Sequence, residues 1–185
     1  MPPKRGLNHE TVIHAAVELA DKQGLESVTL ASVAAQLGIR IPSLYNHVSG
    51  LAGLQRGMAL NAVNQLTDAM RRAATGKAKG DAIHAMASAY RSFALTHPGL
   101  YRLILRAPNP EETDLAAAST ETLDVILDVL AAYRLDGDRA LHMVRIFRSM
   151  VHGFVDLEIA GGFAMALDTD ETFNQLIEIL ISGLP

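Results

Sequence analysis

The 185-residue sequence contains no cysteine and no tryptophan, and its aromatic residues are limited to five Phe and four Tyr. Without cysteine, disulfides and thiolate metal sites are excluded. The longest apolar run, residues 159–167, is far shorter than the roughly 20 residues that a membrane span requires. Residues 2–5 read PPKR and no apolar stretch follows them, so we expect no secretory signal. These absences predict a soluble cytoplasmic protein.

The charge is unevenly distributed along the chain, although the net charge is only −4. Residues 1–80 carry nine Lys or Arg and five Asp or Glu, whereas the remainder carries seven basic and 15 acidic residues. This asymmetry favours an N-terminal part that binds phosphate and a C-terminal part that repels it. Charges that merely cover solvated faces are the alternative.

Helical periodicity runs through the whole sequence, and alternating β-branched runs are almost absent. The first helix ends at Gly24, a second runs from the N-cap Thr29 to Gly38, and a third begins at Pro42. A fourth carries an apolar face between Leu51 and Leu66. After a small, basic linker over residues 75–80, we expect helices over 81–97, 100–105, 113–133, 139–160 and 171–181. The predicted fold is all-α.

The segment LGIRIPSLYNHV, residues 37–48, breaks one helix and starts another within four positions. Glycine tolerates the positive φ of a sharp turn, and proline fits the first turn of the helix that follows. This pattern predicts a helix-turn-helix within a three-helix N-terminal domain. The apolar face of the third helix, Leu44 and Val48, is expected to pack on Val33 and Leu37. Its polar face is then free to enter a major groove. The outward residues are Arg40, Ser43, Asn46 and His47, and Tyr45 is positioned to place its hydroxyl on a phosphate. A purely structural helical hairpin is the alternative.

Residues 10–56 resemble the DNA-binding domain of the TetR family of bacterial transcriptional regulators. The likeness is carried by Thr29, by VA at 33–34, by LGI at 37–39 and by PSLYNHV at 42–48. Members of this family are all-helical homodimers that bind a palindromic operator and release it when a small molecule binds the C-terminal domain. The resemblance implies DNA contacts from Thr29, Arg40, Ile41, Pro42, Ser43, Tyr45, Asn46 and His47, with Lys4 and Arg5 as a basic arm. The sequence departs from the family at Leu51, where a phosphate-binding lysine is usual, and Arg56 or the arm is the candidate replacement.

The C-terminal half resembles a subgroup of this family known for a Trp-His-Gly signature. The matching segments are HPGLYRLIL at 97–105 and MVHGFVDLEIAGGF at 150–163, in which Val151 replaces the tryptophan. We therefore expect a helix-turn-helix domain over residues 1–50, a connecting helix and linker over 51–80, and a larger ligand-binding and dimerisation domain over 81–185.

An effector pocket is expected among the central helices and should be mostly apolar. Its candidate lining residues are Met86, Tyr90, Phe93, Tyr101, Ile104, Leu127, Met143, Phe147, Met150 and Phe154, with polarity from Arg148 or His152. Each of them is also an ordinary candidate for the core.

The last two long helices present apolar stripes that need burial, and dimers of this kind pair such helices in a four-helix bundle. Candidate interface residues are Val151, Val155, Ile159, Phe173, Leu176, Ile177 and Leu180. Burial within a single chain is the alternative.

No metal or catalytic signature is found among the seven histidines or elsewhere in the sequence. The helical spacings His-x-x-x-His and Glu-x-x-His are missing, as are a nucleophile elbow, a phosphate loop and a dinucleotide fingerprint. We expect no metal, no cofactor and no enzymatic activity. The sequence thus predicts a dimeric, ligand-responsive regulator, a repressor, whose partners are operator DNA and a small apolar effector. A helical adaptor for protein partners and an all-α enzyme are the alternatives.

Overall fold

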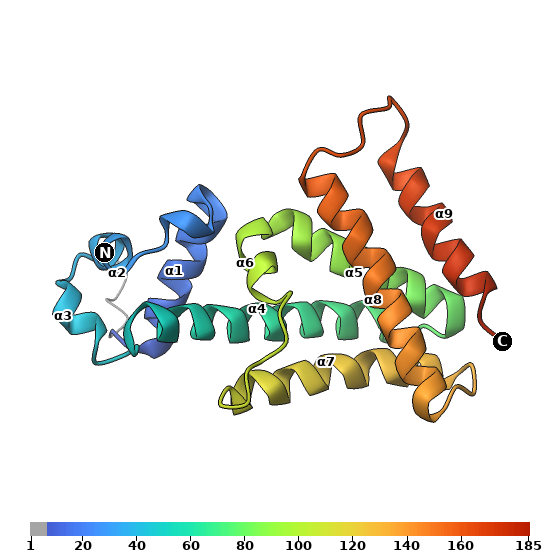
Figure 1. Cartoon of the computed structure of the whole chain (residues 1–185), viewed down its shortest axis with the longest axis horizontal. Coiled ribbons are helices and arrows are strands. Elements are labelled where there is room, and N and C mark those ends of the chain that lie inside the picture. The colour runs from blue at the N-terminus through green and yellow to red at the C-terminus, as the bar shows by residue number, and fades with distance from the viewer. Residues whose placement is uncertain (1–6) are drawn as a thin grey trace. The chain divides into compact units, whose positions relative to one another are not determined.

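The computed structural model describes residues 7–185, and within them the chain forms α-helices and one 3₁₀ turn but no strand. The all-α prediction is confirmed. In chain order the elements, drawn in Figure 1, are α1 (His9–Gln23), η1 (Leu25–Ser27), α2 (Leu30–Leu37), α3 (Ile41–Leu44), α4 (Gly50–Ala74), α5 (Lys79–Thr96), α6 (Pro98–Leu103), α7 (Thr113–Ala131), α8 (Gly137–Ile159) and α9 (Thr169–Ser182).

The chain divides into two compact units. Met1–Val63 and His97–Ala116 form one, which we call the head unit, and Asn64–Thr96 with Ala117–Pro185 form the other, which we call the body unit. Helix α4 contributes residues to both. The head unit is therefore discontinuous in sequence, because α6 and the start of α7 belong to it.

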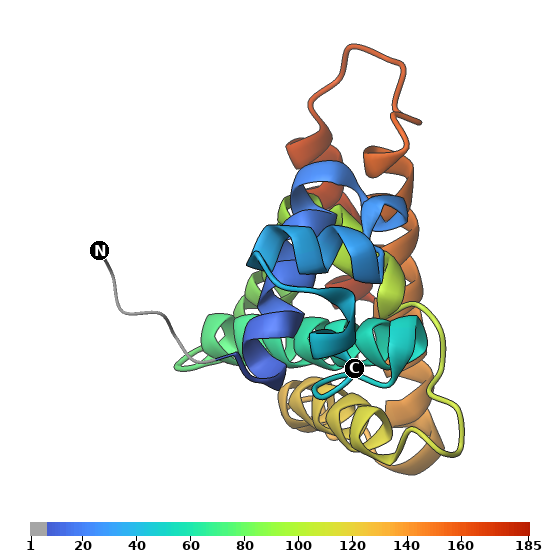
Figure 2. The same cartoon turned by 90° about the vertical axis from the view of Figure 1, so that its left-hand side faces the viewer.

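Local capping explains where the first helices begin and end. The side chain of Asn8 accepts a hydrogen bond from the backbone N–H of Thr11 at 2.8 Å and caps α1, which ends at Gly24 with φ 86°. Thr29 caps α2. In Figure 2, α2 lies across α1. Val12, Ala16 and Val33, all fully buried, form part of the core between these elements.

The third helix is shorter than the sequence predicts. It spans only Ile41–Leu44, and Tyr45 to His47 form a turn. The carbonyl of Leu44 accepts from the backbone N–H of His47 at 2.8 Å and from that of Val48 at 2.9 Å. The end of α3 thus tightens to an i→i+3 hydrogen bond, and the helix does not continue. Gly50, which begins α4, has φ 71°. Every helix after α4 lies within two residues of its predicted bounds.

In the body unit, α5, α8 and α9 pack against one another (Figure 1). Most of the residues predicted for a dimer interface lie inside this packing. Val151, Val155, Phe173, Ile177 and Leu180 are at most 6% exposed, and Ile159 and Leu176 are half-buried. The large apolar side chains that α8 and α9 expose are different ones, namely Leu141, Ile146, Leu157 and Ile179, which are 42–66% exposed.

None of the helices in residues 7–185 combines the length and the apolar character that crossing a bilayer requires.

Candidate functional site

The turn between α2 and α3 is built from two matched signals. The hydroxyl oxygen of Thr29 accepts from the backbone N–H of Ser32 at 3.0 Å, and Ser32 Oγ accepts from the backbone N–H of Thr29 at 2.9 Å, which closes a capping box. At the other end Gly38 adopts φ 66°. Its N–H donates to the carbonyl of Ala35, and the next N–H, that of Ile39, donates to the carbonyl of Ala34. This is a Schellman motif, which requires a left-handed residue at Gly38.

The short helix α3 has a buried face and an exposed face. Leu44 is fully buried and Val48 is 5% exposed, as their predicted packing requires. Ile41 and Tyr45 are 40% and 60% exposed. Among the other residues expected to contact DNA, Arg40, Pro42 and Asn46 are exposed, whereas Ser43 and His47 are half-buried. The turn thus exposes a cation, a phenol and an amide, while Ser43 and His47 are less accessible than expected.

A contact that sequence reasoning missed holds this turn in place. His9, in the first turn of α1, lies with its Nδ1 2.8 Å from the backbone carbonyl oxygen of His47. A carbonyl can only accept, so Nδ1 carries the proton and donates. The bond joins the start of α1 to the turn that follows α3. No sequence pattern pointed to it, because its partner is a backbone atom 38 residues away.

Thr29 has a second role besides the predicted DNA contact. Its side chain is exposed, yet its oxygen already caps α2. A phosphate contact from Thr29 would therefore share a hydroxyl that stabilises the helix.

The cations available to the head unit are few. Lys4 and Arg5 lie outside the described residues. Arg56 Nε donates to Asp114 Oδ1 at 3.1 Å, and this bond lowers the pKa of Asp114. Leu51, at the start of α4, is 40% exposed. Arg56 is one of the two candidate replacements for the lysine that is usual at position 51, and its guanidinium is already hydrogen-bonded to the carboxylate of Asp114.

The charge asymmetry seen in the sequence changes when charges are assigned to the compact units. The head unit contains seven basic and seven acidic residues. Four of the nine basic residues among the first 80 lie in the body unit: Arg71 and Arg72 at the end of α4, Lys77 in the turn that follows, and Lys79 at the start of α5. Any attraction of the head unit to phosphate must therefore come from local placement of cations rather than from its net charge.

The head unit also contains a junction between α1 and α6. His97 Nδ1 lies 2.7 Å from Asp21 Oδ2, and Asp21 Oδ1 is buried without a hydrogen-bond partner among the described residues. Gly99 packs so closely on α1 that a Cβ there would lie 2.9 Å from the carbonyl oxygen of Ala20. Glu26 and Arg102 meet at 3.5 Å beside it. The segment after α5 is thus fastened directly to the first helix.

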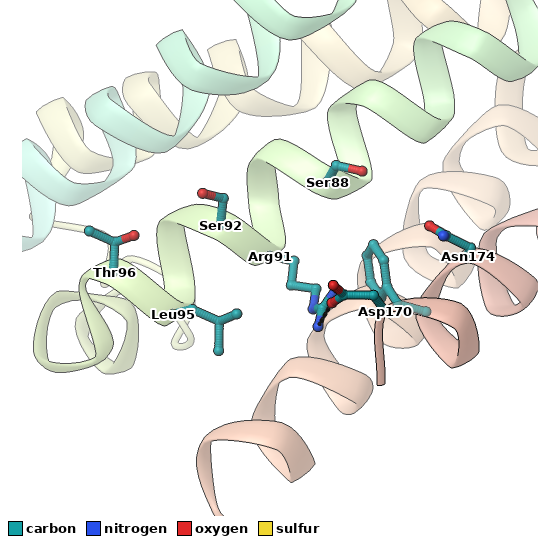
Figure 3. A pocket seen from close by; sticks show the side chains of 8 residues that line it. Ser88, Arg91, Ser92, Leu95, Thr96, Asp170 and Asn174 are labelled. Atoms are coloured by element: carbon teal, nitrogen blue, oxygen red, sulfur yellow. Dashed lines mark ion pairs between the residues drawn. The ribbon is translucent and has the colours of Figure 1, made fainter. Parts of the chain in front are cut away.

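In the body unit, α5 and α9 border a groove of about 500 Å³ (Figure 3). Arg91 lies at its edge and donates to both carboxylate oxygens of Glu158 at 2.8 and 2.6 Å and to Asp170 at 2.7 Å. These bonds, that to Glu158 first, raise the pKa of Arg91. Its guanidinium carbon also lies 4.9 and 5.6 Å from the ring centroids of Phe173 and Phe154. Because the cation is already matched by two carboxylates, this cluster ties α5, α8 and α9 together.

The ten residues predicted to line an effector pocket are mostly packed in the interior. Met86, Tyr90, Phe93, Tyr101, Phe147 and Phe154 are buried, and Ile104, Leu127, Met143 and Met150 are half-buried. Three grooves in the described part of the chain are lined by other residues. The pocket stays a prediction.

Comparisons with known proteins match this arrangement in both units. The model of the family described as bacterial regulatory proteins, tetR family, matches residues 12–50. A second model, described as tetracyclin repressor-like, C-terminal domain, matches residues 83–180. Its description does not include the Trp-His-Gly subgroup, so that finer assignment stays a prediction.

Two curated relatives cover nearly the whole chain. The uncharacterized HTH-type transcriptional regulator Rv0681 of Mycobacterium tuberculosis is 35% identical over 96% of this chain and 82% of its own. The uncharacterized HTH-type transcriptional regulator YobS of Bacillus subtilis is 31% identical over 100% of this chain and 96% of its own.

Two solved structures share the fold. A protein of unknown function from Rhodococcus sp. RHA1 has a TM-score of 0.80 at 23% identity and covers 100% of this chain and 98% of its own. TetR-Q116A from Acinetobacter baumannii, solved in complex with minocycline, has a TM-score of 0.72 at 22% identity and covers 96% of each chain.

Proposed function

This chain belongs to the TetR family of bacterial regulatory proteins, and from that premise we propose that it is a dimeric repressor released from a palindromic operator by a small molecule. The chain is a transcriptional regulator and not an enzyme. Operator binding by this chain, the effector, the dimer, the repressor role and a cytoplasmic location make up the proposal, as does membership of the Trp-His-Gly subgroup.

The observation that supports DNA binding is the exposed face of residues 40–47, which we call the recognition turn. Arg40, Tyr45 and Asn46 project from a backbone fixed by the capping box of α2, the Schellman turn at Gly38 and the bond from His9. Asn46 has the amide that pairs with adenine in a major groove, and Tyr45 has a hydroxyl suited to a phosphate oxygen. A DNA-contacting segment whose backbone is already fixed loses little conformational entropy when it binds.

We assign the dimer surface to the stripe that α8 and α9 leave exposed, rather than to the residues expected from sequence. On α8 the stripe runs through Ile146, Gly153 and Leu157, and on α9 it includes Ile179. Exposed apolar side chains at helical spacing favour burial against another helix. An added Cβ at Gly153 would meet no atom within 4 Å, so no contact within the chain requires a glycine at this position. Pairing two copies would set the distance between recognition turns, which must be about 34–36 Å.

Release by an effector is supported by the family and by one structural neighbour, which was solved with minocycline. We propose that effector binding shifts the population between arrangements of the helices in the body unit, and that α4, which contributes to both units, transmits the shift.

The test uses the DNA upstream of the chain's own gene as the labelled probe in fluorescence anisotropy. We expect saturable binding that weakens on the order of a hundredfold between 50 and 200 mM salt, as a handful of phosphate contacts requires. Tyr45→Phe should weaken binding to operator and scrambled DNA alike, by about 0.5–1.5 kcal/mol for each recognition turn. Asn46→Ala and Ser43→Ala should instead reduce the preference for operator, by about 1–3 kcal/mol for each base that the variant no longer reads.

Lys22→Gln is the matched control, because Lys22 is exposed on α1 and pairs with Glu18. If all three changes in the turn left operator binding as strong and as selective as before, the assignment of the recognition surface would be wrong.

A further inference from the structure

A second groove, distinct from the cluster around Arg91, lies within the body unit where α4 ends and α5 begins. It has a volume of about 330 Å³ and is bordered by the last turn of α4, the turn over residues 75–78, the start of α5 and one face of α7. Small side chains create it, because three helical segments meet with no large residue to fill the space. Its apolar floor consists of Ala74, Ala78, Ala82, Val125, Val129 and Ala132.

Cations dominate the rim of this groove. Arg71, Lys77 and Lys79 line it, against one carboxylate, Asp128. Arg71 is already paired with two carboxylates, since its Nη1 donates to Asp68 at 3.1 Å and its Nη2 lies 4.0 Å from Glu121. Neither lysine forms a salt bridge within residues 7–185, and Lys79 Nζ lies 6.0 Å from the ring centroid of Tyr133. Two ammonium groups thus border apolar surface in a unit whose net charge is negative.

The backbone fixes Lys79 at this position in a conformation that is unusual for its type. Its φ is 49°, and a non-glycine residue in the left-handed region is disfavoured because Cβ crowds its own carbonyl. Such residues persist where the surrounding structure holds them, and they concentrate at binding and switch regions. Here Lys79 is the first residue of α5, two residues before the start that the sequence predicts, and it lines the groove.

We propose that this groove binds an organic monocarboxylate with a short aliphatic body. The carboxylate would lie between the ammonium groups of Lys77 and Lys79, and the hydrocarbon would cover the alanine and valine floor. A volume of about 330 Å³ suits a small ligand. The apolar floor disfavours a small, fully hydrated anion such as inorganic phosphate, which would lose hydration there without a hydrogen-bond partner. Asp128 adds to the cost of a dianion.

The position of the groove gives this binding a regulatory meaning, and that part of the inference rests on the proposed function. Arg71 and Ala74 belong to the last turn of α4, whose first residue, Gly50, follows the recognition turn directly. A ligand that contacts α4 and α7 together favours whichever placement of α4 allows both contacts. An organic monocarboxylate would therefore act as an effector through α4.

The test is isothermal titration calorimetry of the full chain, without DNA, against octanoate and against the uncharged 1-octanol. We expect octanoate to bind at least tenfold more tightly than octanol. The double variant Lys77→Gln/Lys79→Gln should lose at least tenfold of the octanoate affinity and none of the octanol affinity. Ala132→Phe, which fills an exposed part of the floor, should lose both. Lys22→Gln on α1 is the matched control and should bind as the unaltered chain does.

Three results would overturn the proposal: no octanoate binding, equal affinity for octanoate and octanol, or full octanoate affinity in the lysine variant. Far-UV circular dichroism checks the fold, and Lys77→Gln alone, which leaves the residue of unusual φ intact, repeats the test if the double variant unfolds. Because these titrations contain no DNA, they stand whether or not the chain binds an operator. Octanoate that binds but leaves an operator complex intact would overturn only the regulatory part.

Discussion

Glu112 closes the loop between α6 and α7 by binding Arg106. Its carboxylate oxygens accept from Arg106 Nη1 and Nη2, each at 2.6 Å, and one of them accepts from the backbone N–H of Asn109 at 2.8 Å. The bonds from Arg106, followed by the one from the backbone, favour the ionised form and lower the pKa of Glu112 to about 2. The loop that joins α6 to α7 therefore depends on a charged carboxylate.

This dependence predicts how Arg106→Gln responds to pH. A carboxyl group whose pKa is lower in the folded chain contributes stability above its ordinary pKa, and that contribution disappears as the pH falls through the folded value. We expect the variant to be less stable than the unaltered chain at pH 7. The difference should shrink below pH 4.5 and approach zero near pH 2. Urea unfolding followed by circular dichroism at pH 7, 5, 4 and 3 measures it. A difference as large at pH 3 as at pH 7 would contradict the assignment.

Single residues with a conformational role were predictable, and residues with a distant partner were not. Gly38 and Thr29 act on their own helix ends, so the local sequence contains all the information about them. His9 and Asp21 act on atoms 38 and 76 residues away, a backbone carbonyl and an imidazole. Sequence spacing cannot indicate such partners, because they meet only after packing. The exposure of Arg40 and Asn46 followed from knowing which face of α3 is apolar.

At the level of elements, α6 is the short helix whose placement has most effect on the head unit. Its buried Gly99 allows α6 to approach the end of α1 until backbone meets backbone. Gly99→Ala should destabilise the chain by about 1–3 kcal/mol, because neither backbone segment can move aside easily. Gly183→Ala is the control: the nearest atom to its added Cβ lies at 3.5 Å, and a change within about 0.5 kcal/mol is expected. Thermal or urea unfolding gives both values, and equal effects would show that the close approach is not structurally important.

The helices were predictable because apolar periodicity, caps and glycine stops agree along most of the chain. The faces of α8 and α9 were not. Both helices carry apolar residues on two faces, with Val151 and Phe173 inside and Leu157 and Ile179 outside. Periodicity identifies a stripe but cannot decide which of two stripes faces the core, since that depends on the position of α5.

For the molecule as a whole, the exposed stripe on α8 is where self-association should be tested. Leu157 is 53% exposed, and Leu157→Asp would place a charge in the proposed pairing surface. We expect the variant to sediment as a monomer and to bind operator at least about tenfold more weakly, because the second recognition turn is no longer tethered. Leu95→Asp is the matched control, since Leu95 is 42% exposed on α5, which is not one of the two helices that carry the stripe. A dimeric Leu157→Asp would place the interface elsewhere.

The sequence does not predict that the head unit is formed by two separate segments of the chain. Composition changes over residues 75–80 indicated a linker, yet these residues only join α4 to α5 within the body unit. The chain returns to the head unit at His97 because of the contacts of α6 with α1. Those contacts depend on small residues, Ala20 and Gly99, which carry no pattern of their own.

The return of α6 to α1 means that the DNA-binding end of this protein is not a separable N-terminal fragment. A truncation after residue 63 would remove His97 from Asp21 and expose the surface of Ala20 that Gly99 covers. Proteolytic cleavage in the turn over residues 75–78 would leave α6 on the C-terminal piece and α1 on the N-terminal piece, and their packing would keep the two pieces associated until denatured. Chimeras that exchange the head unit between regulators should therefore transfer residues 97–116 together with residues 1–63.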